Sequence, residues 1–235
     1  MRTKLALLAT TALAAMAIAT PAEAAGSGWY LSLTGGGNWL DDNSFATTGP
    51  VAGPAQDTFF LDTESDTGYV IAGAVGLSLG NIVQGLRLEA EVAYRQNQVD
   101  GLWSSDTLVA VGFSSGTVDY DHTSLSVLAN VWYDFDVMGF KPYVGGGLGW
   151  ADVEADGAYA GDVVRSFSYS ADGFAWQLGA GVNFQVAPNM QLGVGYRYFS
   201  AEDVVIGAPD TTNNSLTGTL DDDSHSAVVT LTIGG

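Results

Sequence analysis

The chain has 235 residues and no cysteine, with 26 Asp and Glu against 7 Lys and Arg. The absence of cysteine excludes disulfide and thiolate chemistry. The small number of basic residues excludes a nucleic-acid-binding protein, because such a protein needs Lys and Arg to neutralise phosphates.

The N-terminal segment is typical of a bacterial secretory signal peptide. Arg2 and Lys4 give it a positive start, residues 5–18 are apolar, and Ala22-Glu23-Ala24 matches a small-x-small cleavage site. We predict that residues 1–24 are a cleaved signal peptide and that residues 25–235 form one domain. This domain contains no apolar run of about 18 residues, so the sequence predicts no spanning helix.

Alternation with a period of two recurs along residues 25–235 and predicts eight strands. The expected strands are 28–40, 67–79, 86–96, 122–135, 141–151, 173–186, 190–199 and 224–234. The connections between them alternate between long ones (41–66, 97–121, 152–172 and 200–223) and short ones (80–85, 136–140 and 187–189). We therefore predict an all-β fold, an eight-stranded antiparallel up-and-down transmembrane β-barrel with long external loops and short periplasmic turns.

The segment "LVAVGF", residues 108–113, lies inside the second long connection. It is shorter than the 9–11 residues or so that a spanning strand needs. A small hairpin above the membrane is the favoured interpretation, and a ten-stranded barrel is the alternative.

The segment 86–97 has one apolar and one charged face, and either face can point into a barrel. Apolar residues occupy one parity, and the other carries Arg87, Glu89, Glu91 and Arg95. Asp134 and Arg197 fall on the corresponding parity of two other predicted strands. A soluble lipocalin-like barrel has an apolar interior, so its polar face would be exposed, whereas a membrane barrel presents its apolar face to lipid.

Aromatic residues decide between these two arrangements. Three pairs, each ten residues apart, bracket predicted strands: Trp29 and Trp39, Phe140 and Trp150, Phe174 and Phe184. Ten residues at ~3.3 Å each, tilted by roughly 40°, project to about 25 Å, the height of the apolar band of an outer-membrane barrel. Rings at both edges of such a band belong at lipid–water interfaces. We therefore predict that these rings form an aromatic girdle and that the charged parity lines the lumen.

The stretches "GWYLSLTGGG" (28–37), "KPYVGGGLGW" (141–150) and "LGVGYRYF" (192–199) resemble the small outer-membrane β-barrel family of Gram-negative bacteria, the OmpA-like and porin-like eight-stranded proteins. The resemblance implies location and topology more strongly than activity. It also implies contact with outer-membrane lipid, lipopolysaccharide and the outer-membrane assembly machinery. Members usually end in an aromatic residue that the machinery recognises, whereas this sequence ends in Gly234-Gly235. We expect no appended peptidoglycan-binding domain.

Short motifs give no catalytic, cofactor or metal site. His122 and Ser124 share a strand face but lack a carboxylate within reach, and His225 and Ser226 are adjacent and therefore face opposite ways. "DVEADG" (152–157) resembles the start of a calcium loop, but Val163 occupies the twelfth position, where a bidentate acid is required. The glycine-rich stretches lack the following helix of a phosphate loop. The long connections are acidic, so we expect at most weak binding of divalent cations.

The six charges Arg87, Glu89, Glu91, Arg95, Asp134 and Arg197 are of mixed sign and balance to zero. An eight-stranded barrel is just wide enough to be filled by its own side chains. Enclosed charges must pair, so this ladder predicts a crosslinked plug. We expect a monomeric structural protein serving envelope integrity or surface contact. The alternatives are a narrow porin-like channel for small solutes or ions and, third, a lipid-modifying enzyme.

Overall fold

The structure is a computed structural model that describes residues 28–41, 44–50, 56–105, 115–137, 139–160, 165–208 and 216–234. The predicted signal peptide, residues 1–24, and the segment 108–113 lie outside the described residues. Among the residues described, no helix is long and apolar enough to cross a membrane.

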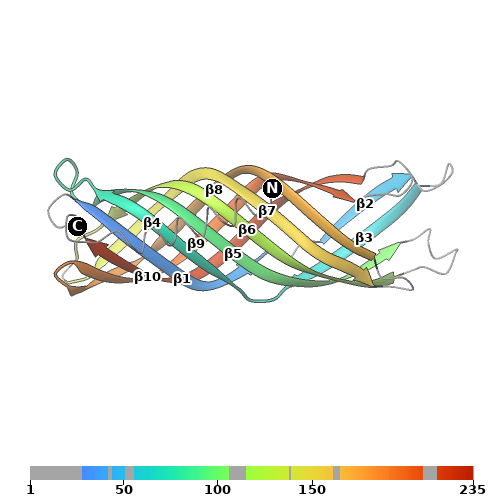
Figure 1. Ribbon diagram of the computed structural model, residues 1–235, viewed down its shortest axis with the longest axis horizontal. Helices are drawn as coiled ribbons and strands as arrows, with labels where there is room; N and C mark the ends of the chain where they lie inside the picture. Colours follow the sequence, from blue (N-terminus) through green and yellow to red (C-terminus); the bar gives the residue numbers. More distant parts are fainter. Residues whose placement is uncertain are drawn as a thin grey trace.

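Ten β-strands make up the described structure (Figure 1). They are β1 (Trp29–Leu40), β2 (Ser44–Pro50), β3 (Gln56–Ser65), β4 (Gly68–Ser78), β5 (Leu86–Ser105), β6 (Ser115–Asp134), β7 (Lys141–Ala160), β8 (Arg165–Ala187), β9 (Met190–Ala208) and β10 (Leu216–Gly234). All of the strand pairings are antiparallel.

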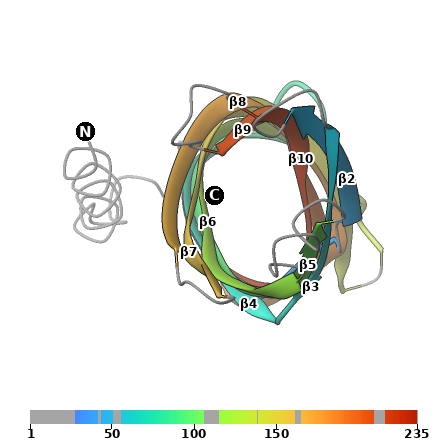
Figure 2. The ribbon, with the colours of Figure 1, turned by 90° about the vertical axis from the view of Figure 1, so that its right-hand side faces the viewer.

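Eight of these strands close into a barrel, as the sequence predicted. Strand β1 pairs with both β4 and β10, and the pairing of β5 with β6 closes the ring. Viewed along the barrel, the ribbons form an oval ring (Figure 2). The other two strands, β2 and β3, form a hairpin that pairs with the outer part of β5, from Val99 to Ser105. Closure satisfies the backbone hydrogen bonds of every wall strand, the condition for crossing a bilayer without helices.

The two ends of the barrel differ. At one end, called the turn end here, short turns join β4 to β5, β6 to β7 and β8 to β9. The turn before β5 requires glycine at Gly85, because its φ is 84° and a Cβ there would meet the backbone oxygen of Asp134 at 2.2 Å. The opposite end, the hairpin end, carries β2, β3 and the far ends of the other strands (Figure 1).

At the hairpin end the strands extend well beyond their predicted bounds, so much of each predicted long connection is itself strand. Strands β5 and β6 continue to pair from Gln98↔Asp121 out to Ser104↔Ser115, and β7 and β8 pair out to Tyr159↔Arg165. The predicted loop 41–66 contains the β2–β3 hairpin, and much of 200–223 belongs to β9 and β10. The strands continue to pair because the alternation with a period of two continues there, with acidic residues in place of apolar ones on the outer face. Ala151 and Val153 point inward, whereas their neighbours Asp152 and Glu154 have the outward parity.

The barrel exposes its apolar parity and buries its charged parity. Leu148, Val127 and Leu178 are 61%, 57% and 56% exposed, whereas the lumen residues Glu91 and Arg197 are 2% and 7% exposed. All six aromatic residues of the predicted girdle are also exposed: Trp29, Trp39, Phe140, Trp150, Phe174 and Phe184. Trp29, Phe140 and Phe184 lie toward the turn end, and the other three lie toward the hairpin end, where Trp150 pairs with Phe174.

This arrangement predicts that the effect of an outward-facing Arg on the free energy of unfolding depends strongly on its height along the barrel. Val131 is exposed on β6, midway between the levels of Trp150 and Phe140. Replacing it with Arg should lower the free energy of unfolding in lipid vesicles by about 2–4 kcal/mol, because the charge enters the apolar band. The matched control is Thr117→Arg, which places the same side chain outward on the same strand but beyond Trp150, and it should have little effect. Equal costs in urea titrations would contradict the assigned faces and band.

Candidate functional site

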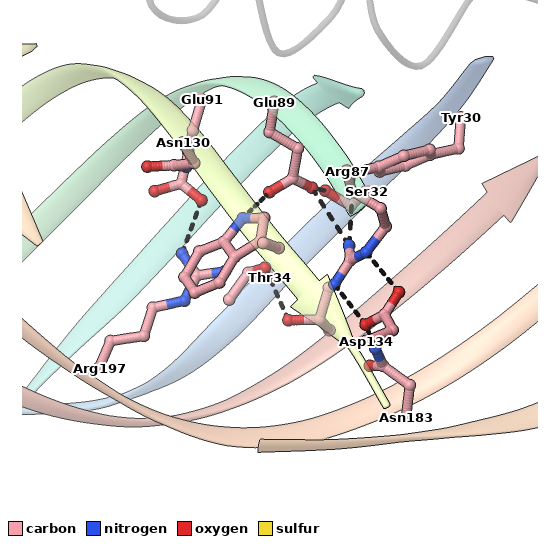
Figure 3. A network of polar contacts seen from close by, with 12 residues as sticks. Tyr30, Ser32, Thr34, Arg87, Glu89, Glu91, Asn130, Asp134, Asn183 and Arg197 are labelled. Atoms are coloured by element: carbon pink, nitrogen blue, oxygen red, sulfur yellow. Dashed lines mark hydrogen bonds and ion pairs between the residues drawn. The ribbon is translucent and has the colours of Figure 1, made fainter. Parts of the chain in front are cut away.

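The lumen is the candidate functional site, because the inward parity of the strands gathers the buried polar and charged side chains there. The structure places all six predicted lumen residues on this face: Arg87, Glu89, Glu91 and Arg95 on β5, Asp134 on β6 and Arg197 on β9. Five of the six take part in ion pairs, and Arg95 is in none that involves described residues. Figure 3 shows the part of this network nearer the turn end.

Toward the turn end, Arg87 is held by Asp134 on the neighbouring strand. Arg87 Nε donates to Asp134 Oδ2 at 2.7 Å and Nη2 donates to Oδ1 at 3.0 Å, so the pair is bidentate. Arg87 Nη1 also donates to the Tyr30 hydroxyl at 3.3 Å, and Asn183 Nδ2 donates to Asp134 at 3.4 Å. This corner therefore joins four strands, β1, β5, β6 and β8 (Figure 3).

The next pair crosses the whole lumen. Arg197 Nη1 on β9 donates to Glu91 Oε2 on β5 at 2.6 Å. Three strands separate β5 from β9 in either direction around the ring, so the two residues project from opposite walls. Gln177 on β8 donates to Glu91 Oε1 at 2.9 Å and to Asn130 Oδ1 at 2.8 Å. Glu91 thus receives hydrogen bonds on both oxygens, as a buried carboxylate requires.

Glu89 lies between these two pairs, and its carboxylate is stabilised mainly by hydrogen bonds from uncharged side chains. Trp132 Nε1 and Ser32 Oγ both donate to its carboxylate, and Arg87 Nη1 is 4.0 Å away. The indole of Trp132 packs edge-on against Tyr143, with ring centroids 5.6 Å apart. Aromatic side chains therefore fill the space between the charged groups.

Glycines on the inner wall make room for these rings. A Cβ at Gly181 or Gly195 would lie 2.6 Å or 2.3 Å from the hydroxyl oxygen of Tyr143. Because real Cβ contacts are longer than this, a larger residue at either position would displace the ring. In the glycine-rich stretch 141–150, a Cβ at Gly145 would likewise lie 2.7 Å from the ring of Trp132, so glycine there serves close packing in a narrow barrel, as expected.

Beyond the Glu91–Arg197 pair, the lumen contains an apolar layer and a second polar group. The apolar layer consists of Leu128, Ala151, Val153, Ala175, Phe199 and Ala201. The guanidinium carbon of Arg95 lies 3.7 Å from the centroid of the Phe199 ring, a cation–π contact. Nearby, Ser226 Oγ donates to Asn38 Oδ1 at 2.6 Å, and Asn38 Nδ2 donates to Asn97 Oδ1 at 2.7 Å. These residues connect β10, β1 and β5.

His122 has a carboxylate partner that the sequence did not predict. Its Nε2 lies 3.0 Å from Oδ1 of Asp222 on β10, which is opposite β6 in the ring. Ser124 Oγ is buried and has no hydrogen-bond partner among the described residues, so the imidazole is not placed to accept its proton. His225 faces outward, where its Nε2 is 2.8 Å from Asp41 Oδ1, whereas Ser226 faces the lumen. His122 and Ser226 therefore bond to partners in the lumen, and His225 bonds to one on the outer face. None of the three is hydrogen-bonded to Ser124 Oγ.

The calcium-loop resemblance at 152–157 falls on β7, not on a loop. Asp152, Glu154 and Asp156 alternate along the outer face of this extended strand, so they cannot wrap around one ion. No group of three or more potential metal ligands with suitable geometry occurs within the described ranges. Asp152 is directly opposite Asp172, and Asp156 is directly opposite Asp121.

Comparison with known proteins identifies the fold family. Residues 5–231 match the family described as "Outer membrane protein beta-barrel domain". The chain belongs to this family. It is thus a small β-barrel protein of the Gram-negative outer membrane, and on the plan of such barrels the turn end faces the periplasm.

Two relatives and one solved structure illustrate the similarity. An outer membrane protein of Gluconacetobacter diazotrophicus is 32% identical over 212 residues, which cover 84% of this chain and 52% of that protein. This chain thus spans about half the length of that relative. An uncharacterised protein of Brucella suis biovar 1 is 28% identical over 198 residues, covering 73% of this chain and 67% of that protein. OprG of Pseudomonas aeruginosa has a TM-score of 0.50 at 13% identity, covering 90% of this chain and 99% of OprG, which shows a shared fold alone.

The His122–Asp222 pair predicts a pH-dependent contribution to stability. It lies beyond the level of Trp150, outside the apolar band. Burial alone lowers the pKa of His122, but the charge of Asp222 and its hydrogen bond outweigh burial and raise this pKa above its ordinary value. The stabilisation is therefore complete below the ordinary pKa of about 6.5 and is lost as pH rises through the raised value.

The measurement is the free energy of unfolding of the wild type and of His122→Gln across this pH range. The difference between them should be largest on the acidic side and shrink as pH rises. A difference that grows with pH would show that the neutral imidazole is the form that the barrel favours.

Proposed function

We propose that this outer-membrane protein has a structural role, in envelope integrity or surface contact, and that its lumen is plugged by its own side chains. The buried Glu91–Arg197 pair carries the proposal, because it joins opposite walls and so lies across any axial path. Two further connections between opposite walls support it, Arg95 on Phe199 and His122 with Asp222.

The signs of the lumen charges also favour a plug over a channel. A channel selective for one ion would more naturally carry rings of a single sign. Here Glu91 receives hydrogen bonds from Arg197 and Gln177, so its charge is compensated by protein groups. The apolar layer around Phe199 lies on the hairpin side of this pair and further narrows the lumen with apolar side chains.

The outer surface suggests how the barrel contacts its surroundings. The exposed girdle rings and the apolar wall between them suit membrane lipid and lipopolysaccharide. Beyond the girdle, Asp100 faces Asp119 across β5 and β6, in addition to the opposed Asp pairs on β6, β7 and β8. Like charges directly opposite each other destabilise a sheet, so loosely bound divalent cations would relieve their repulsion. We propose that the barrel is a monomer, inserted by the outer-membrane assembly machinery.

Planar-bilayer recording tests the plug. The wild type should show little steady conductance, whereas Glu91→Ala should destabilise the barrel and let current leak, because Arg197 loses its partner. Asp119→Asn is the matched control: it also removes one carboxylate, but from the outer face beyond the girdle, and it should leave the conductance unchanged. A stable open channel in the wild type, with a selectivity altered by Glu91→Ala, would overturn the structural proposal in favour of a porin-like one.

Calorimetric titration with Ca²⁺ tests the proposed cation binding. We expect weak binding at several sites that added NaCl screens, because the opposed carboxylates are solvent-exposed pairs on a strand. The double variant Asp152→Asn/Asp156→Asn should reduce the heat only in part. Tight stoichiometric binding that this variant abolishes would instead show a defined calcium site on β7.

A further inference from the structure

Arg95 differs from the other two arginines of the lumen. Arg87 and Arg197 each face a carboxylate within 2.7 Å, whereas Arg95 forms no ion pair with any described residue. It is 3% exposed, and its one hydrogen bond to a described residue runs from Nη1 to Ser126 Oγ at 2.9 Å. Its Nε is buried and has no partner in the described part of the chain. A buried guanidinium with an unused donor and no carboxylate in direct contact is costly unless a ligand supplies an acceptor and a nearby negative charge.

Two further hydroxyl groups at the same level of the lumen also lack partners. Ser124 is the direct cross-strand partner of Arg95, and Ser224 is the direct cross-strand partner of Phe199, on whose ring the Arg95 guanidinium stacks. Ser124 and Ser224 are 2% and 1% exposed, and the Oγ atom of each has no hydrogen-bond partner among the described residues. Arg95 Nε and these two hydroxyls are all groups that can donate.

The carboxylates nearest to this level are already engaged. Asp222, two residues before Ser224, pairs with His122, and Glu91 pairs with Arg197. Neither is bonded to Arg95. The charges of Glu91 and Asp222 attract Arg95 without contacting it. The level therefore has one positive charge that no described carboxylate contacts directly, together with unused donors, and the His122–Asp222 pair lies between it and the outside.

We propose that Arg95, Ser124 and Ser224 form a binding site for a small monovalent anion, a halide or a formate-sized carboxylate. The Nε–Nη2 edge of a guanidinium suits bidentate binding of a carboxylate. In Arg95, Nε has no partner among the described residues, and the donor bonded to Ser126 is Nη1. The serine hydroxyls donate from the β6 and β10 walls. A water molecule would satisfy the hydroxyls but would leave the charge of Arg95 without a negative group in direct contact. A single negative charge matches the single positive one, and the filled lumen admits only a small ligand.

Side-chain NMR of the refolded full barrel in detergent micelles tests the site directly. Residues 25–235 contain four arginines, Arg87, Arg95, Arg165 and Arg197, so their Nε–H signals can be resolved. Titration with sodium chloride or sodium formate, at constant ionic strength maintained with bulky sodium gluconate, should shift the Arg95 signal saturably. The signals of Arg87 and Arg197 should stay in place. Arg95→Lys assigns the signal by removing it.

The double variant Ser124→Ala/Ser224→Ala keeps the arginine and should weaken the affinity about tenfold or more, as expected for lost hydrogen bonds to a charged ligand. Ser32→Ala is the matched control, because it removes a lumen hydroxyl that serves Glu89, and it should bind as the wild type does. No shift of Arg95, or parallel non-saturating shifts of all arginines, would overturn the site. An affinity unchanged in the serine double variant would overturn the roles of Ser124 and Ser224.

Discussion

The fold depends on one constraint: charges enclosed in a narrow eight-stranded barrel must find partners inside it. The pair between Glu91 and Arg197 meets this constraint across the full width of the lumen, with both side chains buried. Neighbouring side chains support the Glu91–Arg197 pair. Gln177 completes the hydrogen bonds of Glu91, and Trp132 fills the space between Glu89 and Arg197. The wall strands are thereby joined through their side chains as well as through their ladders.

The inside-out character of the barrel follows from the same constraint. Because most of the polar groups pair with one another inside, the outward parity between the aromatic girdles can be almost entirely apolar and can face lipid. Bulky lumen residues such as Tyr143 on β7 fit because glycines on the nearby strands β8 and β9 leave room for them. Toward the hairpin end the wall changes character: its outward parity becomes acidic, while Val153 and Ala201 still pack inside. One continuous wall therefore serves two environments, lipid and water.

The sequence was sufficient to predict the eight wall strands, their faces and the inward position of the six lumen charges, because a period of two assigns every residue to a face. It was not sufficient at the hairpin end. There the acids of "ADVEADGAYA" suggested a loop, although its alternation of small and acidic residues is itself a strand pattern. Nor could it predict that Asp222 meets His122, since partners on opposite walls depend on strand number and stagger, which local alternation does not encode. For the same reason the sequence could not predict that Arg95 contacts no carboxylate among the described residues.

A double-mutant cycle on Glu91 and Arg197 tests most directly whether the pair across the lumen holds the barrel together. The free energy of unfolding in lipid vesicles would be measured for the wild type, Glu91→Met, Arg197→Met and the double variant. We expect each single change to cost about 3–5 kcal/mol, because it leaves a buried charge unpaired, and the double change to cost much less than the sum. The coupling energy should then be about 2–3 kcal/mol. Costs that simply add would contradict the account, because they would show that the two side chains do not depend on each other.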